Sequence, residues 1–249
     1  GFFIPSAICA LRIPVSMYLH DVQLAIPSGI LLFGEENKFI HTSPFQKCYE
    51  KVIKSLVGSP DEVISPSTWI LSFYKKRGFF PHSKTHVLGI SSIDSKKISA
   101  TLEALRLKVK NKQDVHFIVI GTIEEYKGVK TLLSVWKEFP KTYYLHIFGS
   151  GSLAHMVKDI AKEDARITYY GYQPHDKIQP VLDSSDALIM PTLCYENRPE
   201  VILEAFRNNK PVFASNLGGV TELIDEGKTG ALFTPGDEDG LRAILQNDT

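Results

Sequence analysis

Two glutamates eight positions apart are the first residues of the chain whose types and spacing could do chemistry. Glu196 and Glu204 lie in the segment PTLCYENRPEVILEAF. Pro199 suits the first position of a helix, which places Glu196 in the loop ahead of it and Glu204 between the second and third helical turns. Two carboxylates so arranged can serve one ligand, one at its reacting end and one deeper beside the helix. Two ordinary glutamates on a helix surface are the alternative.

The backbone between these glutamates could also bind a ligand. The first N–H groups of a helix have no partner within the helix, and the helix dipole favours an anion there. The N–H groups near Asn197 and Arg198 are therefore expected to contact hydroxyls or a phosphate.

A lysine in the loop GTIEEYKG is a candidate phosphate contact. Gly121 opens this loop after an apolar run and lets the backbone approach a ligand closely. Lys127 stands just before the next helical pattern, where its ammonium charge and the helix dipole both favour an anion. A solvated loop lysine is the alternative.

The segment GSGSLA, residues 149–154, matches the dinucleotide-binding fingerprint G-x-G-x-x-[GA]. A dehydrogenase of that type needs a carboxylate at the end of the next strand to hold a ribose. Here the next apolar run ends in Tyr169, Tyr170 and Gly171. The sequence therefore argues against NAD binding, and a close turn ahead of a helix explains the glycines.

The composition narrows the class of protein. The 249 residues are 43% hydrophobic, with 28 basic and 28 acidic side chains. This apolar content excludes a disordered chain, and zero net charge argues against a general nucleic-acid binder. The three cysteines, Cys9, Cys48 and Cys194, fit neither a disulfide framework nor a zinc knuckle and favour a reducing compartment. With no histidine-rich ligand set in the chain, we expect no metal and no cofactor.

From residue 115 onward, short apolar runs alternate with helical patterns, which predicts strands and helices that position these loops. The runs are about five residues long and the helical segments about ten, as a βαβ repeat requires. Right-handed crossovers then give an open parallel sheet with helices on both faces and ligands beyond the carboxyl ends of its strands. Gly218 and Gly219 are expected to open one of the helices, with Glu222 in its first turn.

The first part of the chain alternates less regularly. The polar, lysine-rich stretch 91–114 is the candidate junction, with a helix inside it. Ser67 is expected to cap the helix that follows it. The expected fold class is α/β with two units: an incomplete unit at 1–92, a linker region at 93–113 and a second unit at 114–249. The elements expected in the first unit are strands at 14–21, 61–67 and 85–90 and helices at 44–57 and 68–77.

Two apolar stretches bear on membrane contact. Pro5, Arg12 and Pro14 interrupt the first nineteen residues, which excludes a spanning helix and favours a buried strand or helix. The segment TWILSFYKKRGFF, residues 68–80, mixes aromatic and basic side chains as interfacial helices do, and a core-packed helix with a basic end is the alternative. We expect a cytoplasmic protein, with a peripheral contact at the inner face of the membrane left open.

The ordered set of motifs resembles the retaining glycosyltransferases of family 4. The resemblance covers residues 114–249 closely and extends more loosely over His20–Asp21, Asp61–Ser67 and Val87–Ser91. It implies the GT-B fold, with two facing Rossmann-like domains and a donor cleft between them. The second half-chain would bind a nucleotide sugar, and the first would supply the side that receives a saccharide or lipid-linked acceptor. The motifs are GTIEEYKG, IFGSGSL, ITYYGYQ, DALIMPTLCYENRPEVILEAF, NLGGVTELIDEGKTG and FTPGDEDGL.

This resemblance also implies roles for individual residues. Lys127 would contact the donor diphosphate, Glu196 would lie by the donor sugar, and Glu204 would accept hydrogen bonds from ribose hydroxyls. His20 would face the donor sugar from the first domain, and Tyr172 would lie where the base is held. Glu196, His20 and Lys127 form the expected catalytic set. The other residues implied to contact the nucleotide sugar are Gly121, Thr122, Gly149, Gly151, Asn197, Arg198 and Pro199.

One position departs from the family pattern. The family commonly has an arginine directly after the glycine at position 121, and this chain has Thr122. Removing one preorganised charge from a leaving phosphate typically costs about 10²–10³ in rate. Either another cation substitutes, with Arg198 as the candidate, or turnover is slow.

The expected function is transfer of a sugar from a UDP- or GDP-linked donor to a hydroxyl acceptor, in polysaccharide or glycolipid synthesis. The transfer would retain the configuration of the sugar and need no metal. The acceptor hydroxyl would attack from the side of the leaving group, while Glu196 orients or stabilises the sugar. A nucleotide-sugar-binding module that is weak or inactive in transfer is one alternative, and a sugar-nucleotide phosphorylase or isomerase on the same fold is another.

The length of the chain qualifies these expectations. The sequence begins at Gly1 rather than Met and stops at Thr249, directly after a helical pattern, and it is short for the family. We therefore expect an internal fragment or a reduced form of the enzyme. Its donor site should be nearly complete and its acceptor site partial.

Overall fold

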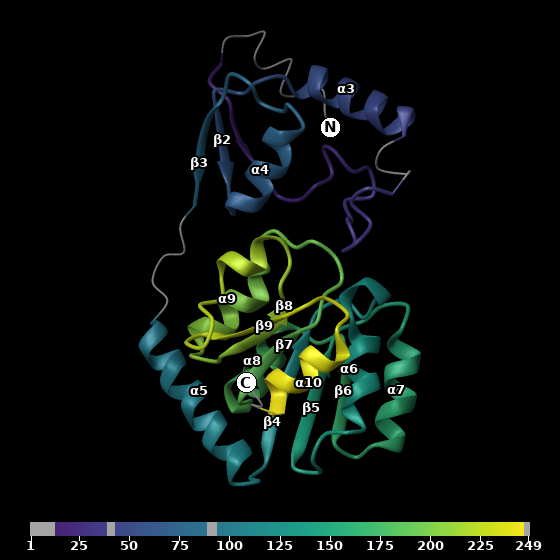
Figure 1. Cartoon of the computed structure of the whole chain (residues 1–249), viewed down its shortest axis with the longest axis vertical. Helices are drawn as coiled ribbons and strands as arrows, with labels where there is room; N and C mark the ends of the chain where they lie inside the picture. The colour runs from purple at the N-terminus through teal and green to yellow at the C-terminus, as the bar shows by residue number, and fades with distance from the viewer. Residues whose placement is uncertain (1–12, 39–42, 89–93, 247–249) are drawn as a thin grey trace. The chain divides into compact units, whose positions relative to one another are not determined.

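A computed structural model describes residues 13–38, 43–88 and 94–246 (Figure 1). The chain divides into two compact units. The first comprises Gly1–Ser91 together with the short segment Cys194–Arg198. The second comprises Ser92–Leu193 and Pro199–Thr249. The chain therefore leaves the second unit once, contributes five residues to the first, and returns.

The first unit is built on a parallel sheet in which the strand order is β1-β2-β3. These strands are β1 (Ser16–Tyr18), β2 (Glu62–Ser65) and β3 (Lys84–Val87). Helices α3 (Pro44–Val57) and α4 (Thr68–Lys76) belong to the same unit and contribute to its core. Residues 1–12, which hold most of the expected N-terminal strand or helix, lie outside the described residues. The buried side chains of this core include Leu19, Val22, Ile26, Ile53, Val63, Ile70, Phe73, Tyr74, Phe79 and Phe80.

Serine caps explain where both helices of the first unit begin. The Ser43 side chain accepts a hydrogen bond from the N–H of Gln46, and the Ser67 side chain accepts one from the N–H of Ile70, each over 3.2 Å. Such a cap satisfies one of the backbone donors that the first turn leaves without a helical partner. The predicted cap at Ser67 is confirmed.

The second unit is built on a larger parallel sheet with the strand order β6-β5-β4-β7-β8-β9. The order reverses between β4 and β7, which creates a switch point where the following loops diverge to opposite sides. Each strand is a short apolar run, as the sequence predicts. The strands are β4 (Val115–Ile120), β5 (Tyr143–Phe148), β6 (Ile167–Gly171), β7 (Ala187–Met190), β8 (Val212–Ser215) and β9 (Gly230–Phe233).

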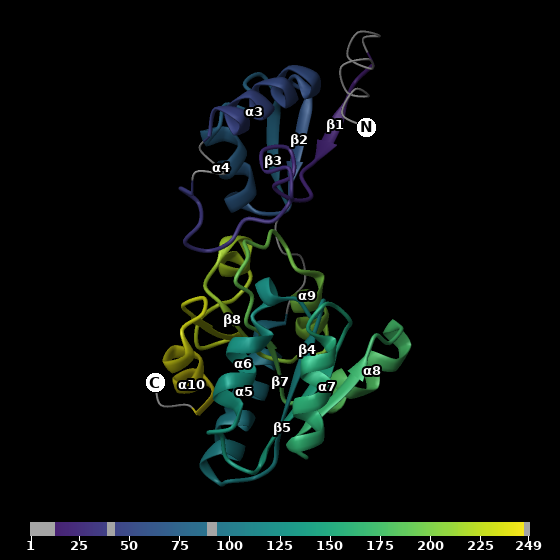
Figure 2. The ribbon, with the colours of Figure 1, turned by 90° about the vertical axis from the view of Figure 1, so that its right-hand side faces the viewer.

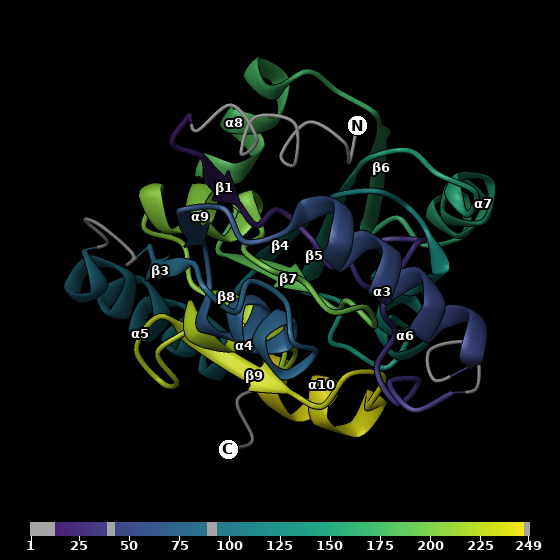
Figure 3. The same cartoon turned by 90° about the horizontal axis from the view of Figure 1, so that it is seen from above.

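Helices cover both faces of this sheet, because successive strand residues point to opposite sides. On β4, Phe117 and Val119 join one core cluster while Ile118 joins the other. Figure 3 shows α8 and α9 on one side of the strands and α6 and α10 on the other, and Figure 2 gives the side view. The helices are α5 (Ser95–Lys110), α6 (Val129–Trp136), α7 (Ala154–Glu163), α8 (His175–Ser184), α9 (Glu200–Arg207) and α10 (Glu238–Gln246).

Three local expectations differ from the structure in detail. The stretch expected as a linker holds the predicted helix, α5, but the buried Leu102 and Leu105 of that helix belong to a core cluster of the second unit. Gly218–Glu222 form only a short 3-10 helix, in which Glu222 is the last residue rather than part of a first α-helical turn. Pro199 is the cap ahead of α9 and has extended backbone angles, so the helix begins at Glu200, one position later than expected.

The aromatic side chains of the segment 68–80 pack into the core of the first unit. Phe73, Phe79 and Phe80 are each at most 7% exposed. The guanidinium of Arg77 lies 3.8 Å from the ring centre of Phe73. This is the core-packed alternative, and these aromatics are not available to enter a membrane surface. Within the described ranges, no helix is both long and apolar enough to cross a bilayer.

Candidate functional site

A pocket of about 360 Å³ lies at the carboxyl ends of β4, β5 and β6, within the second unit. Four of the predicted ligand-contacting residues, Gly121, Thr122, Gly149 and Tyr172, line it together. Tyr172 is 76% exposed, so its ring stands at the rim. The sequence reasoning assigned no role to the other lining residues, although Phe148, Ser150 and Gln173 lie within the quoted motifs. The lining residues without an assigned role are Ile120, Phe148, Ser150, Gln173 and Ile178.

Phe148 lines the pocket and is the first of a row of aromatic and histidine side chains in contact with one another. Tyr170 stacks on Phe148 with ring centres 4.2 Å apart. The Tyr170 hydroxyl lies 3.0 Å from Nδ1 of His146, whose Nε2 lies 3.0 Å from Nδ1 of His116. Burial and the neighbouring His116 lower the pKa of His146, which favours a neutral ring near pH 7. This row holds Phe148 in place beneath the pocket.

Glycines allow the loops at this edge to pack backbone to backbone. A Cβ atom at Gly149 would lie 1.7 Å from the carbonyl oxygen of Gly121, and one at Gly151 would lie 2.4 Å from that of Ile123. The same contact recurs at Gly128, where a Cβ would lie 1.7 Å from the carbonyl oxygen of Pro191. The G-x-G pattern is therefore required by the neighbouring loop, independently of any ligand.

A carboxylate of the chain occupies the turn that leads into α7. Glu124 accepts hydrogen bonds from both the N–H and the hydroxyl of Ser152. These bonds hold the pKa of Glu124 below its ordinary value. In a dinucleotide-binding fold, this position ahead of the helix would receive the pyrophosphate. The Glu124 carboxylate takes that position here. The sequence reasoning missed Glu124, although this residue lies in the loop between Gly121 and Gly128 that the sequence marks as a ligand loop.

Lys127 stands at the start of α6, as predicted. It is the last residue of a short 3-10 helix, Glu125–Lys127, and Gly128 then adopts a left-handed conformation before the α-helix begins. Its ammonium lies 5.7 Å from the ring centre of Tyr126. The loop is fixed further because the Tyr126 carbonyl accepts a hydrogen bond from the N–H of Leu193. The backbone that carries Lys127 is thus held by the loop after β7, through Leu193 and Pro191.

The two glutamates of the E-x7-E pair fall in different units. Glu204 lies in the second turn of α9, with Oε1 3.6 Å from Nε2 of His175 at the start of α8. Glu196 lies in the segment Cys194–Arg198 of the first unit, and the thiol of Cys194 lies 3.5 Å from its carboxylate. Their predicted roles toward a sugar and a ribose stay predictions.

Within the first unit, the segment Cys194–Arg198 contacts the end of β1 and the start of α4. The side-chain amide of Asn197 donates to the carbonyls of Leu19 and His20 and accepts from the Ser67 hydroxyl. The His20 imidazole itself is 88% exposed and lies 3.6 Å from Asp21. The structure therefore brings His20 and the neighbour of Glu196 together, a contact between residues more than 170 positions apart in sequence.

A buried tyrosine fixes the same loop from the other side. The Tyr74 hydroxyl donates to the carbonyl of Asp21 over 2.6 Å and accepts from the N–H of Leu24 over 3.2 Å. Burial raises the pKa of Tyr74 above its ordinary value, so the hydroxyl stays protonated. Nothing in the local pattern of α4 distinguishes Tyr74 from an ordinary core aromatic, and sequence reasoning missed it.

Arg198 has few contacts in the first unit. One guanidinium nitrogen lies 3.5 Å from the carbonyl of Leu88, and the buried Nε has no hydrogen-bond partner among the residues described. Thr122, where the family commonly has arginine, is exposed at the pocket in the second unit. Whether Arg198 supplies the missing charge stays a prediction.

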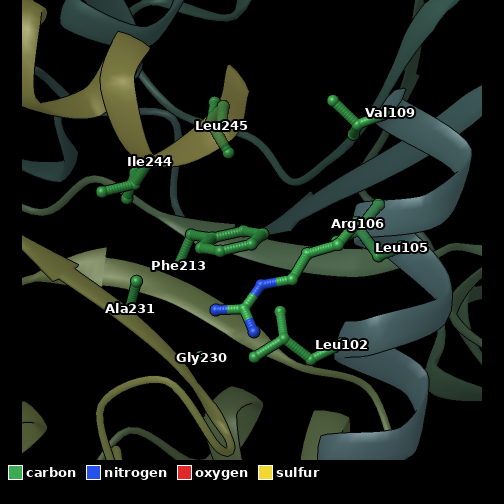
Figure 4. Close-up of a pocket in the computed structure, with 9 residues that line it drawn as sticks. All are labelled: Leu102, Leu105, Arg106, Val109, Phe213, Gly230, Ala231, Ile244 and Leu245. Atoms are coloured by element: carbon green, nitrogen blue, oxygen red, sulfur yellow. The ribbon is translucent and has the colours of Figure 1, made fainter. Parts of the chain in front are cut away.

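A second pocket, of about 30 Å³, lies away from these loops (Figure 4). Arg106 reaches into it from α5, and Phe213 of β8 and Ile244 and Leu245 of α10 lie around it. Its size admits little more than a water molecule. It does not lie at the carboxyl ends of the strands, and none of the predicted site residues lines it.

Acidic side chains near α10 are used within the protein. Asp237 accepts a hydrogen bond from the N–H of Gly240, and Asp239 pairs with Arg242. Over the part of the chain that the structure describes, no group of three or more His, Cys, Asp or Glu side chains is placed to hold a metal ion.

A family profile and several known proteins are similar to this chain. The profile of the family described as glycosyl transferases group 1 matches residues 101–247. The chain is 27% identical over 260 residues to N-acetyl-alpha-D-glucosaminyl L-malate synthase of Bacillus anthracis, which covers 96% of this chain and 61% of that protein. It is 28% identical over 152 residues to the amylovoran biosynthesis glycosyltransferase AmsK of Erwinia amylovora, covering 57% of this chain and 37% of the relative.

The fold is similar to that of Anabaena Alr3699/HepE, whose crystal structure is a complex with UDP. The TM-score is 0.71 at 20% identity, over 98% of this chain and 64% of that one. This likeness confirms the expected GT-B fold, with two Rossmann-like units of which the first has the smaller sheet. The chain spans less than two thirds of the length of the Bacillus and Anabaena proteins. Because the family profile matches more than half of the chain, and the ordered loop motifs fall within that match, this chain belongs to the glycosyl transferases group 1 family.

Proposed function

We propose that this chain transfers a sugar from a UDP- or GDP-linked donor to a hydroxyl acceptor with retention of configuration, in polysaccharide or glycolipid synthesis. The single observation that carries the proposal is the pocket at the carboxyl ends of β4–β6, which has Gly121 and Thr122 in its lining. Lys127 follows in the same loop, at the start of α6. The family membership and the UDP bound by the Anabaena neighbour support a nucleotide donor.

The nucleotide is assigned to the second unit. The base would enter the pocket beside Tyr172 and Ile178, where an aromatic ring and an aliphatic side chain suit a flat heterocycle. The diphosphate would lie toward Lys127, whose charge and helix N-terminus both favour an anion. Glu204 would accept hydrogen bonds from the ribose hydroxyls.

The transfer step follows from these assignments. The acceptor oxygen forms a bond to the anomeric carbon on the face from which the diphosphate leaves, as the bond between that carbon and the phosphate oxygen breaks. The acceptor proton passes to the departing phosphate oxygen. Glu196 and His20 would orient the sugar as positive charge develops on its ring, and Lys127 would stabilise the leaving diphosphate.

A turnover and binding assay tests this proposal. The protein is incubated with UDP- and GDP-sugars, with and without saccharide or lipid-linked acceptors, and released nucleoside diphosphate is measured. Acceptor-dependent release is expected, and the anomeric configuration of the product is read by NMR. Binding without release would support the inactive module instead, and sugar release that depends on inorganic phosphate would support a phosphorylase.

The contact to the diphosphate is tested by Lys127→Ala. We expect the affinity for UDP or GDP, measured by calorimetry, to fall about 10²-fold, because a charge-assisted contact to phosphate is lost. Lys130→Ala is the matched control, since Lys130 pairs with the exposed Glu125 on the surface of the same region. Unchanged affinity in Lys127→Ala would refute the assignment of Lys127.

A further inference from the structure

The side-chain amide of Asn197 is engaged on all sides by the protein. Nδ2 donates to the carbonyl oxygens of Leu19 over 3.1 Å and of His20 over 2.9 Å. Oδ1 accepts from the Ser67 hydroxyl over 2.6 Å. Because carbonyl oxygens only accept, these partners fix which end of the amide carries the nitrogen. Both amide hydrogens are used, so the side chain has no donor left for a sugar hydroxyl.

These three contacts are themselves anchored in the first unit. The N–H of Leu19 bonds to the carbonyl of Ile64 in β2, which ties this point to the sheet. Ser67 caps α4 through its hydroxyl. The amide of Asn197 therefore joins the end of β1 and the start of α4 to the segment that carries Glu196.

Tyr195 holds the other side of Glu196. Its ring stacks on Trp69 with centres 5.1 Å apart, and its hydroxyl donates to the Glu36 carboxylate over 2.6 Å. Its N–H bonds to the carbonyl of Leu31. The residues directly before and after Glu196 are thus both fixed to the first unit, by contacts with three separate stretches of chain: 19–20, 31–36 and 67–69.

From this arrangement we infer that Asn197 is a positioning residue of the proposed transfer, one that fixes the backbone of Glu196 relative to that of His20. The inference rests on the proposed function, in which both residues face the donor sugar. The ligand contact expected at Asn197 concerns its backbone rather than its side chain. Its backbone N–H remains a predicted ligand contact. A displacement of about 1 Å at a reacting group can cost about 10² in rate, so loss of this amide should lower turnover.

The test uses Asn197→Ala in the full chain and separates turnover from donor binding. We expect kcat with the nucleotide sugar that the wild-type protein consumes to fall about 10²-fold. The affinity for the released nucleoside diphosphate, measured by calorimetry, should stay within about twofold of wild type, because the proposed nucleotide contacts lie in the second unit. Asn197→Ser, which keeps one donor, should give an intermediate kcat. Asn111→Ala, at an exposed asparagine after α5, is the control.

A second measurement does not depend on activity. An endoproteinase that cleaves after glutamate is added, and mass spectrometry follows cleavage of the peptide bond after Glu196. We expect faster cleavage there in both Asn197 variants than in the wild type, with other sites unchanged. Asn197→Ser also keeps the test informative if Asn197→Ala does not fold.

The outcomes distinguish this inference from the proposed function. If the wild type releases sugar but both variants match it in kcat and cleavage, the inference is wrong and the proposed function stands. A loss of nucleotide affinity with unchanged cleavage would make Asn197 a donor contact and also overturn the inference. If the wild type transfers no sugar from any UDP- or GDP-sugar, the proposed function fails and the positioning role falls with it.

Discussion

The strand-end loops of the two units are held in different ways. In the second unit, the loops after β4, β5 and β7 pack backbone against backbone, through Gly121, Gly128 and Gly149. In the first unit, the loop after β1 is held by side chains, chiefly the Tyr74 hydroxyl and the Asn197 amide. The proposed donor-binding loops are thus fixed chiefly by close approach of main chain, with Glu124 and Ser152 adding side-chain hydrogen bonds, and the loop of His20 chiefly by side-chain hydrogen bonds.

The strand-end loops of the two units should therefore tolerate different substitutions. A Cβ added at Gly128 or Gly149 would lie 1.7 Å from a carbonyl oxygen of a neighbouring loop, which leaves no space for any side chain. The second unit therefore depends on glycine at these positions. A side-chain hydrogen bond contributes about 1 kcal/mol and can be removed without forcing the backbone apart. We therefore expect steep losses from small additions in the second unit and graded losses from deletions in the first.

The largest effect is expected from Gly149→Ala. The added Cβ would meet the carbonyl oxygen of Gly121 at 1.7 Å, and the φ angle of 141° is one that other residues rarely adopt. We expect a loss of about 4 kcal/mol or more in the free energy of unfolding, seen as a drop in Tm of about 10 °C.

Gly171→Ala is the control for this substitution. It has a φ of 70° but no atom within 4 Å of the added Cβ, so it should cost only about 1 kcal/mol. Equal effects of the two substitutions would show that loop packing does not require Gly149. The second unit would then not depend on close backbone contacts in the way proposed.

An intermediate effect is expected from Tyr74→Phe in the first unit. The change removes one hydroxyl and leaves the carbonyl of Asp21 and the N–H of Leu24 without this partner. We expect a loss of about 2 kcal/mol, together with faster hydrogen exchange at the Leu24 amide. Tyr143→Phe is the matched control in the second unit, where the hydroxyl donates to the carbonyl of Leu245 in α10.

Tyr143→Phe should leave exchange in the loop after β1 unchanged and cost about 1 kcal/mol. If Tyr74→Phe left the exchange of Leu24 at its wild-type rate, the loop of His20 would not depend on this hydroxyl. The first unit would then resemble the second in its reliance on backbone contacts.

The smallest effect is expected from acid titration of Asp164. Hydrogen bonds from the Arg166 guanidinium lower the pKa of Asp164 below its ordinary value. A carboxylate with a lowered pKa stabilises the fold fully above its ordinary pKa, and the contribution is lost as the pH falls through the lowered value. We expect Asp164→Asn to lower Tm by about 2 °C relative to the wild type at pH 7. This difference in Tm should disappear near pH 2, where the wild-type carboxylate is protonated as well.

The Asp164–Arg166 pair lies just before the start of β6. Arg166 donates to the carbonyls of Trp136, Phe139 and Pro140, near the start of β6 rather than at its carboxyl end. The hydrogen bonds of the Asp164–Arg166 pair therefore lie away from the proposed ligand loops of the second unit. Nucleotide affinity should be the same in Asp164→Asn and wild type, and a change in that affinity would contradict this separation.

Much of the fold could be predicted because its signals are local. The apolar runs of β4 and β5 and the helical spacing of Val129, Leu132 and Trp136 lie within single elements. The serine cap at Ser67 needs only its own first turn. Boundaries were less accurate, as at Pro199, since a helix start depends on backbone angles that neighbouring residues share.

In the candidate site too, the residues with local sequence signals could be predicted and those that depend on distant parts of the chain could not. Glycines at the ends of predicted strands indicated Gly121 and Gly149, and the family resemblance implied Thr122 and Tyr172. The structure places these four around one pocket. Glu124 could not be assigned from the sequence, because its role depends on a turn 28 residues away. Sequence spacing also presented Glu196 and Glu204 as one motif, whereas the structure assigns them to different units.

The sequence by itself determined the α/β alternation, the parallel sheet of the second unit and the ordered loop motifs, because periodicity and turn chemistry act over a few residues. Only the tertiary structure decided that Cys194–Arg198 joins the first unit, with Asn197 bonded to His20. It also decided that Gly149 serves its neighbouring loop and that Tyr74 holds the loop after β1. The physical reason is that hydrogen bonds and steric exclusion act over a few ångströms in space, whatever the separation along the chain.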